Sequence, residues 1–357
     1  MLFLSKNCHY GVRGAPLKWF ESYLTSRYQY VQISNSKSNQ QRIDCGVPQG
    51  SIIGPILFLL YINDLPQATN LFSIMFADDS NVFTAGSSTA ECIETLNKEL
   101  VLLTSWIHSN KLSLNVDKSH LIVFSKAQHA PTDSIVLLDR KQLTQVHSIK
   151  FLGVIIDDKL SWQQHVNYIR GKLSRTIGIL SRVRRTLNPS TLRNIYFAFT
   201  HPYLTYCLDV WGQCSAQLFQ SIFVLQKRAI RTLSSSKKNA PTANLFSSLN
   251  ILPLRNLYIQ SIAIFMFKFH RHLLPPVFDD LFSHNTQVHS VGTRQASLLH
   301  PPRTNTRIGQ KSIRFRGCFI WNQLRRSLNT DSSLFTFKKH LKNSLSSGLE
   351  IRLTPLQ

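Results

Sequence analysis

The apolar residues in the first part of the chain change their spacing several times. Leu17, Phe20 and Leu24 recur at helical spacing and predict an opening helix. The next apolar run, over residues 28–33, is short and rich in tyrosine and β-branched residues, as in a strand. A polar turn over residues 34–41 follows it. The sequence therefore begins with a helix and at least one strand.

Two further helices are predicted from capping residues and apolar periodicity. Ser51 is a suitable N-cap and Pro55 fits the first turn of an apolar helix that runs to about Ile62. A longer amphipathic helix is predicted over residues 89–110. Its apolar stripe consists of Ile93, Leu96, Leu100, Leu103 and Ile107.

Between these helices lies a pair of short apolar runs, residues 71–76 and 81–84. The segment that separates them, Ala77-Asp78-Asp79-Ser80, predicts a β-hairpin with both acids at its tip. Two more strand candidates follow at residues 121–124 and 151–156. The first 160 residues thus mix strands with helices.

From His165 onward the pattern becomes helical and basic. One apolar stripe consists of Val166, Ile169, Leu173, Ile177, Leu180 and Val183. Most of the cations fall between its members: Arg170, Lys172, Arg175, Arg182, Arg184 and Arg185. Asn188 and Pro189 restart a helix, and residues 215–233 repeat the design with Lys227, Arg228 and Arg231 directed outward. We interpret the stripes as core and the cationic faces as functional candidates.

The charge of the chain is concentrated in its second part. Residues 1–160 contain 14 Lys and Arg against 13 Asp and Glu, whereas residues 161–357 contain 27 against 5, a net charge of +22. Such an excess of cations attracts polyanions. A solvated basic face and a membrane surface are the competing interpretations. The length of the basic region, with large apolar residues interleaved, favours nucleic acid.

The remaining composition excludes several classes of protein. The six cysteines form no CxxC pair, which argues against a zinc module or a disulfide framework and for a reducing compartment. The longest apolar run, residues 52–62, is about half a membrane span and contains Gly54 and Pro55. Residues 287–310 are predicted to be a loop or linker, ahead of a last helix around residues 334–345.

Asp78 and Asp79 are the main candidates for chemistry. Two acids at a hairpin tip are usually a solvated turn, but here apolar strands flank them. A stiff backbone suits ligands of Mg²⁺, which demands near-ideal octahedral oxygen geometry. The glycine-framed segment Gly46-Val47-Pro48-Gln49-Gly50-Ser51 lies just upstream, where its glycines would let backbone approach a ligand.

These motifs, in this order and spacing, resemble those of reverse transcriptases from non-LTR (LINE-type, jockey-like) retrotransposons. The likeness covers nearly the whole chain. It rests on residues 46–55 with 61–65, Phe76-Ala77-Asp78-Asp79, Leu112-Ser113-Leu114-Asn115 with Lys118-Ser119, and Phe151-Leu152-Gly153-Val154. Further matching segments are Tyr10–Gly14 through Trp19 to Arg27, Pro202-Tyr203-Leu204, Trp211-Gly212 and Trp321-Asn322.

The resemblance implies roles for individual residues. Asp78 and Asp79 would bind Mg²⁺ or Mn²⁺ for two-metal nucleotidyl transfer. Lys118 would be the general acid for the leaving pyrophosphate, against the alternative of a solvated loop lysine. The nucleotide site would be lined by Gln49, Gly50 and Ser51. The partners would be an RNA template, a DNA primer or target, and deoxynucleoside triphosphates, with template and primer bound by Arg27 and the cations of the basic helices.

The resemblance also implies an α+β fold with a division into three regions. Residues 1–160 would be an incomplete palm, an antiparallel sheet with helices. Residues 161–235 would be a helical thumb, and residues 236–357 a basic, mostly helical C-terminal region. Nuclear residence without a signal peptide or membrane span is expected from how such elements integrate. The oligomeric state is left open.

One expected feature of the family is missing from this sequence. The family carries another aspartate in an FD-like motif, and residues 1–10 resemble the segment just after it. We therefore expect an N-terminally truncated element whose fingers and endonuclease lie upstream, with exposed apolar surface on the palm and only trace polymerase activity. The alternative is a catalytically inactive nucleic-acid-binding remnant. A repurposed structural protein has no positive support.

Overall fold

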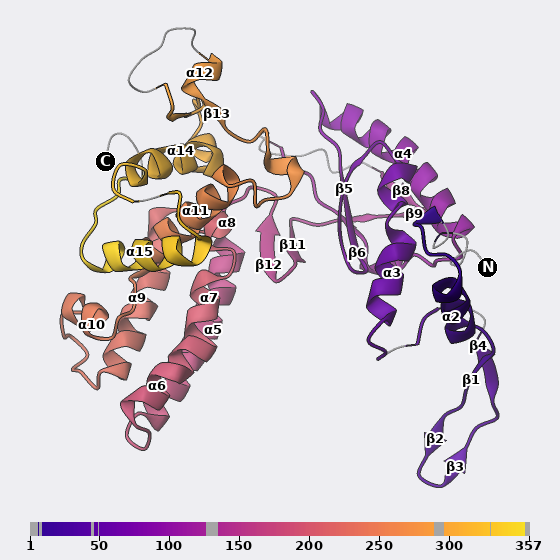
Figure 1. Cartoon of the computed structure of the whole chain (residues 1–357), viewed down its shortest axis with the longest axis horizontal. Coiled ribbons are helices and arrows are strands. Elements are labelled where there is room, and N and C mark those ends of the chain that lie inside the picture. Colours follow the sequence, from indigo (N-terminus) through magenta and orange to yellow (C-terminus); the bar gives the residue numbers. More distant parts are fainter. Residues whose placement is uncertain are drawn as a thin grey trace. The chain divides into compact units, whose positions relative to one another are not determined.

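The computed structural model describes residues 6, 9–43, 46–48, 50–125, 135–288, 296–328 and 330–353. It is 52% helical and 12% strand, which agrees with the predicted α+β class. The chain divides into two compact units, Met1–His147 and Ser148–Gln357 (Figure 1). The functional division into palm, thumb and C-terminal region stays a prediction.

The helix predicted through Leu17, Phe20 and Leu24 is α2 (Ala15–Leu24) in the first unit. The strand expected over residues 28–33 is one side of a two-stranded ribbon. The chain folds back through the predicted polar turn to form the other side. Its strands are β1 (Arg27–Gln29), β2 (Gln32–Ile33), β3 (Ser36–Lys37) and β4 (Gln41–Ile43). β1 pairs antiparallel with β4, and β2 with β3.

The rest of the first unit packs around one long helix, α4 (Thr89–Ser109). It begins at the predicted residue and ends one residue earlier than predicted, and its buried residues Leu96, Leu100, Leu103 and Ile107 confirm the predicted apolar stripe. Around it lie helix α3 (Gly54–Ile62), the turn η1 (Leu65–Ala68), the hairpin β5 (Phe72–Phe76) and β6 (Asp79–Phe83), and the turn η2 (Val116–Lys118). Four short strands follow: β7 (His120–Leu121), β8 (Leu137–Leu138), β9 (Lys141–Gln142) and β10 (Thr144–Gln145).

The strands do not form the single antiparallel sheet expected of a palm. Across the described ranges every ladder has two strands, and β7 pairs with β10 in parallel. The strand predicted at residues 121–124 is shorter than expected. The strand predicted at residues 151–156 is instead a hairpin of β11 (Ser148–Phe151) and β12 (Val154–Asp157). Its turn residues Leu152 and Gly153 both have positive φ, so a continuous strand cannot pass through them.

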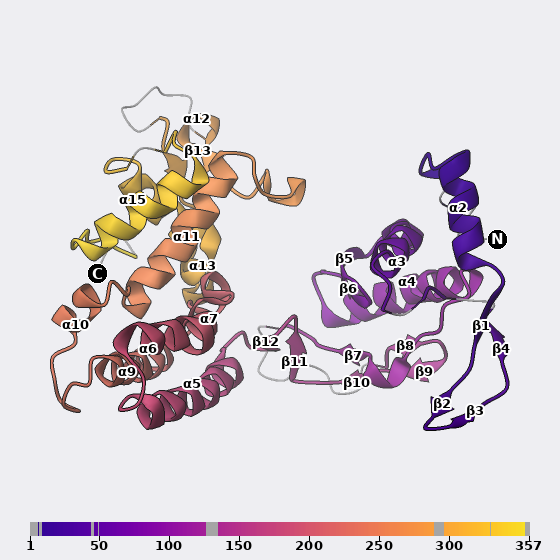
Figure 2. The same cartoon turned by 60° about the horizontal axis from the view of Figure 1, so that its bottom comes forward.

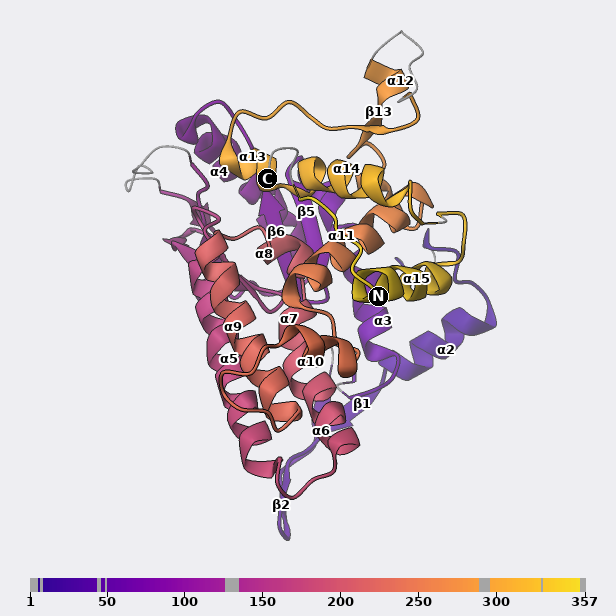
Figure 3. The same cartoon turned by 90° about the vertical axis from the view of Figure 1, so that its left-hand side faces the viewer.

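The second unit is a helical body with one extended core (Figure 3). Helices α5 (Gln163–Val183) and α9 (Ala216–Leu233) lie side by side, as predicted from their apolar stripes. Between them run α6 (Pro189–Ile195), the π-helical turn η3 (Tyr196–Thr200), α7 (His201–Thr205) and α8 (Leu208–Trp211). The predicted cap is confirmed, because the Asn188 side chain accepts from the Thr191 amide at 2.8 Å.

The C-terminal part of this unit adds a second layer around helix α11 (Leu254–His270). Helices α14 (Ile313–Leu324) and α15 (Leu334–Ser346) pack on it, and α15 confirms the predicted last helix. The described parts of the segment predicted as a loop, residues 287–288 and 296–310, hold short elements, and residues 289–295 lie outside the description. The remaining elements are α10 (Ala243–Ser248), η4 (Pro276–Phe278), β13 (Ser283–His284), α12 (Asn285–Val288), β14 (Leu299–His300) and α13 (Arg307–Lys311).

No helix within the described residues has both the length and the apolar character needed to cross a membrane.

A buried histidine joins the β11–β12 hairpin to helix α5. His165 is 2% exposed, and its Nδ1 accepts from the Ile155 amide at 3.2 Å. In the neutral ring the proton is therefore on Nε2. Burial lowers the pKa of His165 to about 4. Protonation would place a hydrogen on Nδ1 and remove the bond to Ile155.

Acid should therefore weaken the second unit. The unfolded chain binds a proton at His165 near pH 6.5 and the folded chain only near pH 4. The contribution of neutral His165 to the free energy of unfolding is therefore complete above pH 6.5 and is lost as the pH falls from 6.5 to 4. We expect His165 to account for a loss of about 3 kcal/mol in the free energy of unfolding. Urea titrations at pH 7 and pH 4 of the wild type and of His165→Asn, which retains an acceptor, measure it. An equal fall in both proteins would contradict it.

Candidate active site

The β5–β6 hairpin presents Asp78 and Asp79 at its end, as predicted. Phe76 pairs with Asp79 across the ladder, so the turn consists of Ala77 and Asp78. Both acids are exposed. Ala77 has φ of +53°, a conformation at which tight hairpin turns favour glycine. Such local strain is common at functional turns.

The inner face of this hairpin packs on helix α4. Met75 and Val82 contact the cluster formed by Leu65, Leu103 and Ile107. The entry to β5 is fixed by hydrogen bonds to the Glu99 carboxylate, which accepts from the Thr69 hydroxyl at 2.8 Å and from the Asn70 amide at 2.7 Å. The Asn70 side chain also donates to this carboxylate at 3.0 Å, and this hydrogen bond contributes most to lowering the pKa of Glu99. The acids thus stand on a positioned ribbon.

The outer face of the hairpin is apolar and exposed. Phe72 and Phe76 are 55% and 60% exposed, and Ile74 and Phe83 lie on the same ribbon. The rings of Phe72 and Phe83 lie 6.1 Å apart. The expected exposed apolar surface is therefore present beside the two acids.

The glycine-framed segment has the backbone geometry that its composition predicts. Gly46 and Gly50 have φ of +79° and +80°, in the left-handed region that favours glycine. The Ser51 hydroxyl donates to the Pro48 carbonyl at 2.8 Å and accepts from the Gly54 amide at 3.0 Å. Helix α3 begins at Gly54 and its N-cap is Ile53, so the prediction of Ser51 as the N-cap is wrong. Ser51 is half-buried and Gly50 is exposed, while Gln49 lies outside the described residues.

Lys118 ends the turn η2 and is exposed. The residues just before it anchor this segment, because Leu114 and Val116 pack against the same clusters of the α4 core as Val82 of β6. The predicted general acid and the acidic hairpin are therefore mounted on one core. The role of Lys118 in proton transfer stays a prediction.

A cation that the sequence pattern did not single out joins helix α3 to helix α4. The Lys6 ammonium donates to the Asp64 carboxylate at 2.7 Å and to the Tyr61 carbonyl at 2.9 Å. It also lies 4.5 Å from the centre of the Trp106 ring. Lys6 thus ties the end of α3 to α4. The neighbouring motif Tyr61–Leu65 was recognised, but nothing in the spacing links Lys6 to it.

The predicted nucleic-acid-binding cations differ in their surroundings. Arg170, Arg175, Arg182, Arg185 and Arg228 are exposed, whereas Lys172, Arg184, Lys227 and Arg231 are half-buried. Two of the predicted cations bind backbone carbonyls. The Arg231 Nε donates to Ala240 at 2.9 Å, and the half-buried Arg27 guanidinium donates to Leu24 at 3.1 Å and Gly46 at 2.6 Å. These two arginines hold local structure, so fewer of their donors are free for phosphate.

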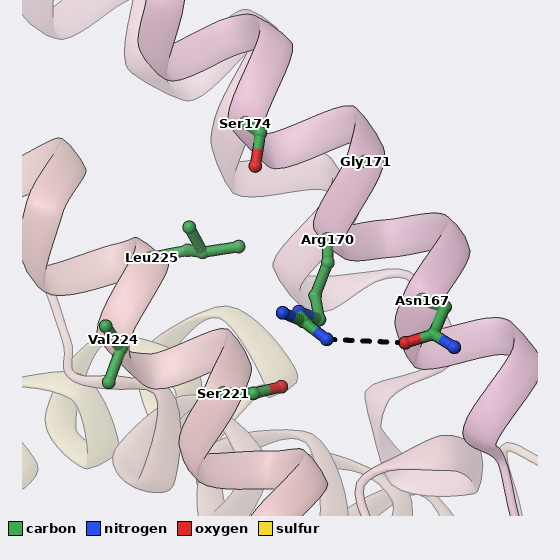
Figure 4. Close-up of a pocket in the computed structure, with 7 residues that line it drawn as sticks. All are labelled: Asn167, Arg170, Gly171, Ser174, Ser221, Val224 and Leu225. Carbon is green, nitrogen blue, oxygen red and sulfur yellow. Dashed lines mark hydrogen bonds between the residues drawn. The ribbon is translucent and has the colours of Figure 1, made fainter.

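A groove of about 480 Å³ runs between helices α5 and α9 (Figure 4). The guanidinium of Arg170 reaches into it and lies 3.4 Å from the Asn167 side-chain oxygen. The lining of the groove includes the small residues Gly171, Ser174 and Ser221. This groove places a cation beside small polar side chains on the basic face.

The turn of the β11–β12 hairpin is held by a tyrosine from the helical body. The Tyr206 hydroxyl donates to the Leu152 carbonyl, and a Cβ on Gly153 would lie 3.4 Å from the Tyr206 ring. The Trp211 indole in turn donates to the Tyr206 carbonyl at 2.8 Å. Sequence motifs flagged this hairpin and Trp211 separately, and the structure joins them through Tyr206.

Asp78 and Asp79 supply hard oxygen donors of the kind that Mg²⁺ binds. Among the residues that the structure describes, no group of three or more His, Cys, Asp and Glu side chains is arranged to hold a metal. The assignment of Asp78 and Asp79 as metal ligands stays a prediction.

Comparison with known proteins finds one family similar to most of the first unit and to the start of the second. Residues 7–156 match the family described as reverse transcriptase (RNA-dependent DNA polymerase). This part of the chain is similar to reverse transcriptases. The match includes the glycine-framed segment, the acidic hairpin, Lys118 and most of the β11–β12 hairpin.

Curated relatives extend the similarity beyond that match. The chain is 27% identical over 228 residues to the RNA-directed DNA polymerase from mobile element jockey of Drosophila melanogaster, covering 60% of this chain and 25% of that protein. It is 25% identical over 308 residues to the probable polymerase from transposon X-element of the same fly, covering 82% and 31%. The probable polymerase from transposon BS is 26% identical over 245 residues, covering 65% and 27%. These relatives confirm the resemblance to non-LTR retrotransposon reverse transcriptases, of which the chain spans about a quarter to a third.

Proposed function

We propose that this chain acts in RNA-directed DNA synthesis and that Asp78 and Asp79 are its metal ligands. The observation that carries the proposal is the position of both acids at the end of an anchored apolar hairpin, inside the segment that matches the reverse transcriptase family. Divalent cations at such a site activate the attacking hydroxyl and stabilise the leaving pyrophosphate. The hairpin's part is to hold the two carboxylates in place.

Other residues have supporting roles in this proposal. Gln49, Gly50 and Ser51 line the nucleotide site, where the left-handed backbone at Gly50 allows close approach. Lys118, exposed and anchored through Val116, donates a proton to the pyrophosphate. The exposed arginines of α5 and α9 bind the phosphates of template and primer. The partners are thus an RNA template, a DNA primer or target, and deoxynucleoside triphosphates, and the expected site of action is the nucleus.

A second function, nucleic-acid binding without catalysis, is favoured by the charge distribution. The 27 cations against 5 acids in residues 161–357 bind polyanions whether or not the acidic hairpin works. The two functions are separated by metal binding and by primer extension.

Metal binding by the hairpin is tested with Mn²⁺, followed by electron paramagnetic resonance. We expect Asp78→Asn to raise the dissociation constant for Mn²⁺ at least about tenfold. Removing a group that only hydrogen-bonds to a metal ligand already weakens metal binding by about this factor, and removing a ligand itself should cost no less. Glu94→Gln is the matched control, because Glu94 is an exposed acid on α4 that pairs with Lys98. Equal Mn²⁺ affinity in wild type and Asp78→Asn would overturn the metal-ligand assignment.

Primer extension in the same samples tests the catalytic part. With Mg²⁺ and an oligo(dT) primer on poly(rA), we expect trace extension that Asp78→Asn removes, because two carboxylates alone fix two cations weakly. Robust extension that Asp78→Asn abolishes would contradict the expected trace activity but would still support Asp78 as part of the active site. Extension that survives Asp78→Asn would place catalysis elsewhere.

A further inference from the structure

The two-stranded ribbon of residues 27–43 exposes large side chains along its first side, residues 28–33. Figures 1 and 2 show it as a long arm that follows helix α2. Tyr28 and Tyr30 are 60% and 47% exposed, and Val31 and Ile33 are 64% and 72% exposed. Exposed apolar and aromatic groups gathered on one short ribbon mark an interaction surface.

Each tyrosine of the arm has a cation beside it. Tyr28 lies directly opposite Arg42 in the β1–β4 ladder, and side chains of such pairs are neighbours on one face. The Lys37 ammonium lies 5.4 Å from the centre of the Tyr30 ring. Aromatic faces flanked by cations are the combination that binds bases and phosphates together.

The charge of the arm favours a polyanion over a protein surface. Residues 27–43 contain three cations and no Asp or Glu. A second copy of the chain would bring the same positive ribbon against it, with like charges facing each other. A nucleic acid instead complements the cations with phosphates. Because bases of a duplex stack on one another, only unpaired bases offer their faces to Tyr28 and Tyr30.

The arm is organised before any ligand binds. At its base, Arg27 donates to the Leu24 and Gly46 carbonyls and so clamps the two strands where they leave the unit. In its middle, Val31 and Ser38 exchange hydrogen bonds, the Val31 amide donating to the Ser38 hydroxyl at 2.9 Å and the Ser38 amide to the Val31 carbonyl at 2.9 Å. The tyrosines are therefore carried on a fixed backbone, which lowers the entropy lost on binding.

We propose that this arm is a single-strand-binding site, in which unpaired bases of RNA or DNA stack on Tyr28 and Tyr30 while Lys37 contacts an adjoining phosphate. The site is distinct from the acidic hairpin and requires no nucleotidyl transfer. It also differs from the arginines of α5 and α9, which read phosphate charge and do not distinguish paired from unpaired bases. The site is thus independent of the proposed catalysis.

The test compares single-strand and duplex binding by the whole chain. Fluorescence anisotropy with labelled U₂₀ RNA and with a 20-base-pair duplex is measured for the wild type, Tyr28→Ala/Tyr30→Ala, and the matched control Tyr28→Phe/Tyr30→Phe. We expect the alanine pair to weaken U₂₀ binding about tenfold or more, since stacking on an aromatic ring contributes about 1–3 kcal/mol per base. The phenylalanine pair keeps the stacking faces and should stay within about twofold, and duplex binding should change by less than about twofold.

Two results would overturn the proposal. The first is an alanine pair that binds U₂₀ as the wild type does; if this variant also has a lower sedimentation coefficient, the arm is assigned to self-association. The second is an equal loss for U₂₀ and duplex, which would indicate a general effect on the fold. Because none of these readouts needs polymerase activity, failure of the proposed catalysis leaves the test intact.

Discussion

Raising the salt concentration from 50 to 300 mM is expected to weaken binding of this chain to duplex nucleic acid by about 10⁴-fold. The second unit carries exposed arginines on α5 and α9, and each phosphate contact releases a bound counterion. About six such contacts give a slope near −5 in log affinity against log salt, which produces this loss over a sixfold range. Filter binding at several salt concentrations measures the slope.

This prediction is tested further with a variant that lacks two arginines on one face of helix α5. Arg175 and Arg182 are exposed and seven residues apart on α5, so they lie on the same side two turns apart. Arg175→Gln/Arg182→Gln should reduce the magnitude of the slope by about 2. Lys98→Gln, an exposed cation of α4 that already pairs with Glu94, should leave it unchanged. A wild-type affinity that is the same at 50 and 300 mM would refute the electrostatic assignment of the basic half.

The long helices were predictable because their information is local. α4 begins at Thr89 after the Ser88 cap, whose side chain accepts from the Glu91 amide, and it ends one residue before the predicted boundary. α9, which lies within the predicted range of residues 215–233, follows a Ser215 cap in the same way. A cap and a stripe at 3.6-residue spacing fix such a helix without knowledge of the rest of the chain.

Long-range polar contacts were not predictable in this way. Gln226 lies within the α9 stripe and is 0% exposed, donating to the Leu252 carbonyl at 2.9 Å and accepting from the Leu254 amide at 2.8 Å. Its partners are 26 and 28 residues away. A polar residue in an apolar stripe indicates that a buried partner exists but not which backbone supplies it.

The candidate site also combines features that the local sequence predicted with long-range contacts that it did not. Asp78 and Asp79 were placed correctly at the end of a hairpin because the apolar runs on either side define the turn. The engagement of Arg27 with the Gly46 carbonyl was not foreseen, since a cation between strands has the same sequence pattern whether it binds phosphate or backbone. Motif spacing therefore locates the acids, while the free donors of a cation depend on the folded neighbours.

Trp211→Ala is expected to lower the free energy of unfolding of the second unit by about 3–5 kcal/mol. Trp211 is 0% exposed in the main core, and its ring lies edge-on to His165 at 6.0 Å. Truncation leaves a cavity and removes the indole bond to the Tyr206 carbonyl. Because Tyr206 holds the turn at Leu152, the β11–β12 hairpin should lose order along with the core.

Urea unfolding followed by circular dichroism measures this loss, and hydrogen exchange of the β12 amides reports the hairpin. Phe335→Ala is the matched control in the same unit, because Phe335 is 78% exposed and should change stability by less than about 0.5 kcal/mol. Trp211→Phe retains a ring but not the indole donor, and it provides a folded variant in which faster exchange at Ile155 can still be seen. If Trp211→Ala unfolded at the wild-type urea concentration, this tryptophan could not be the link between the helical body and the hairpin. Faster exchange in Trp211→Phe with little change in the unfolding midpoint would assign the hairpin's order chiefly to the Tyr206 contact, since the core would then be nearly intact.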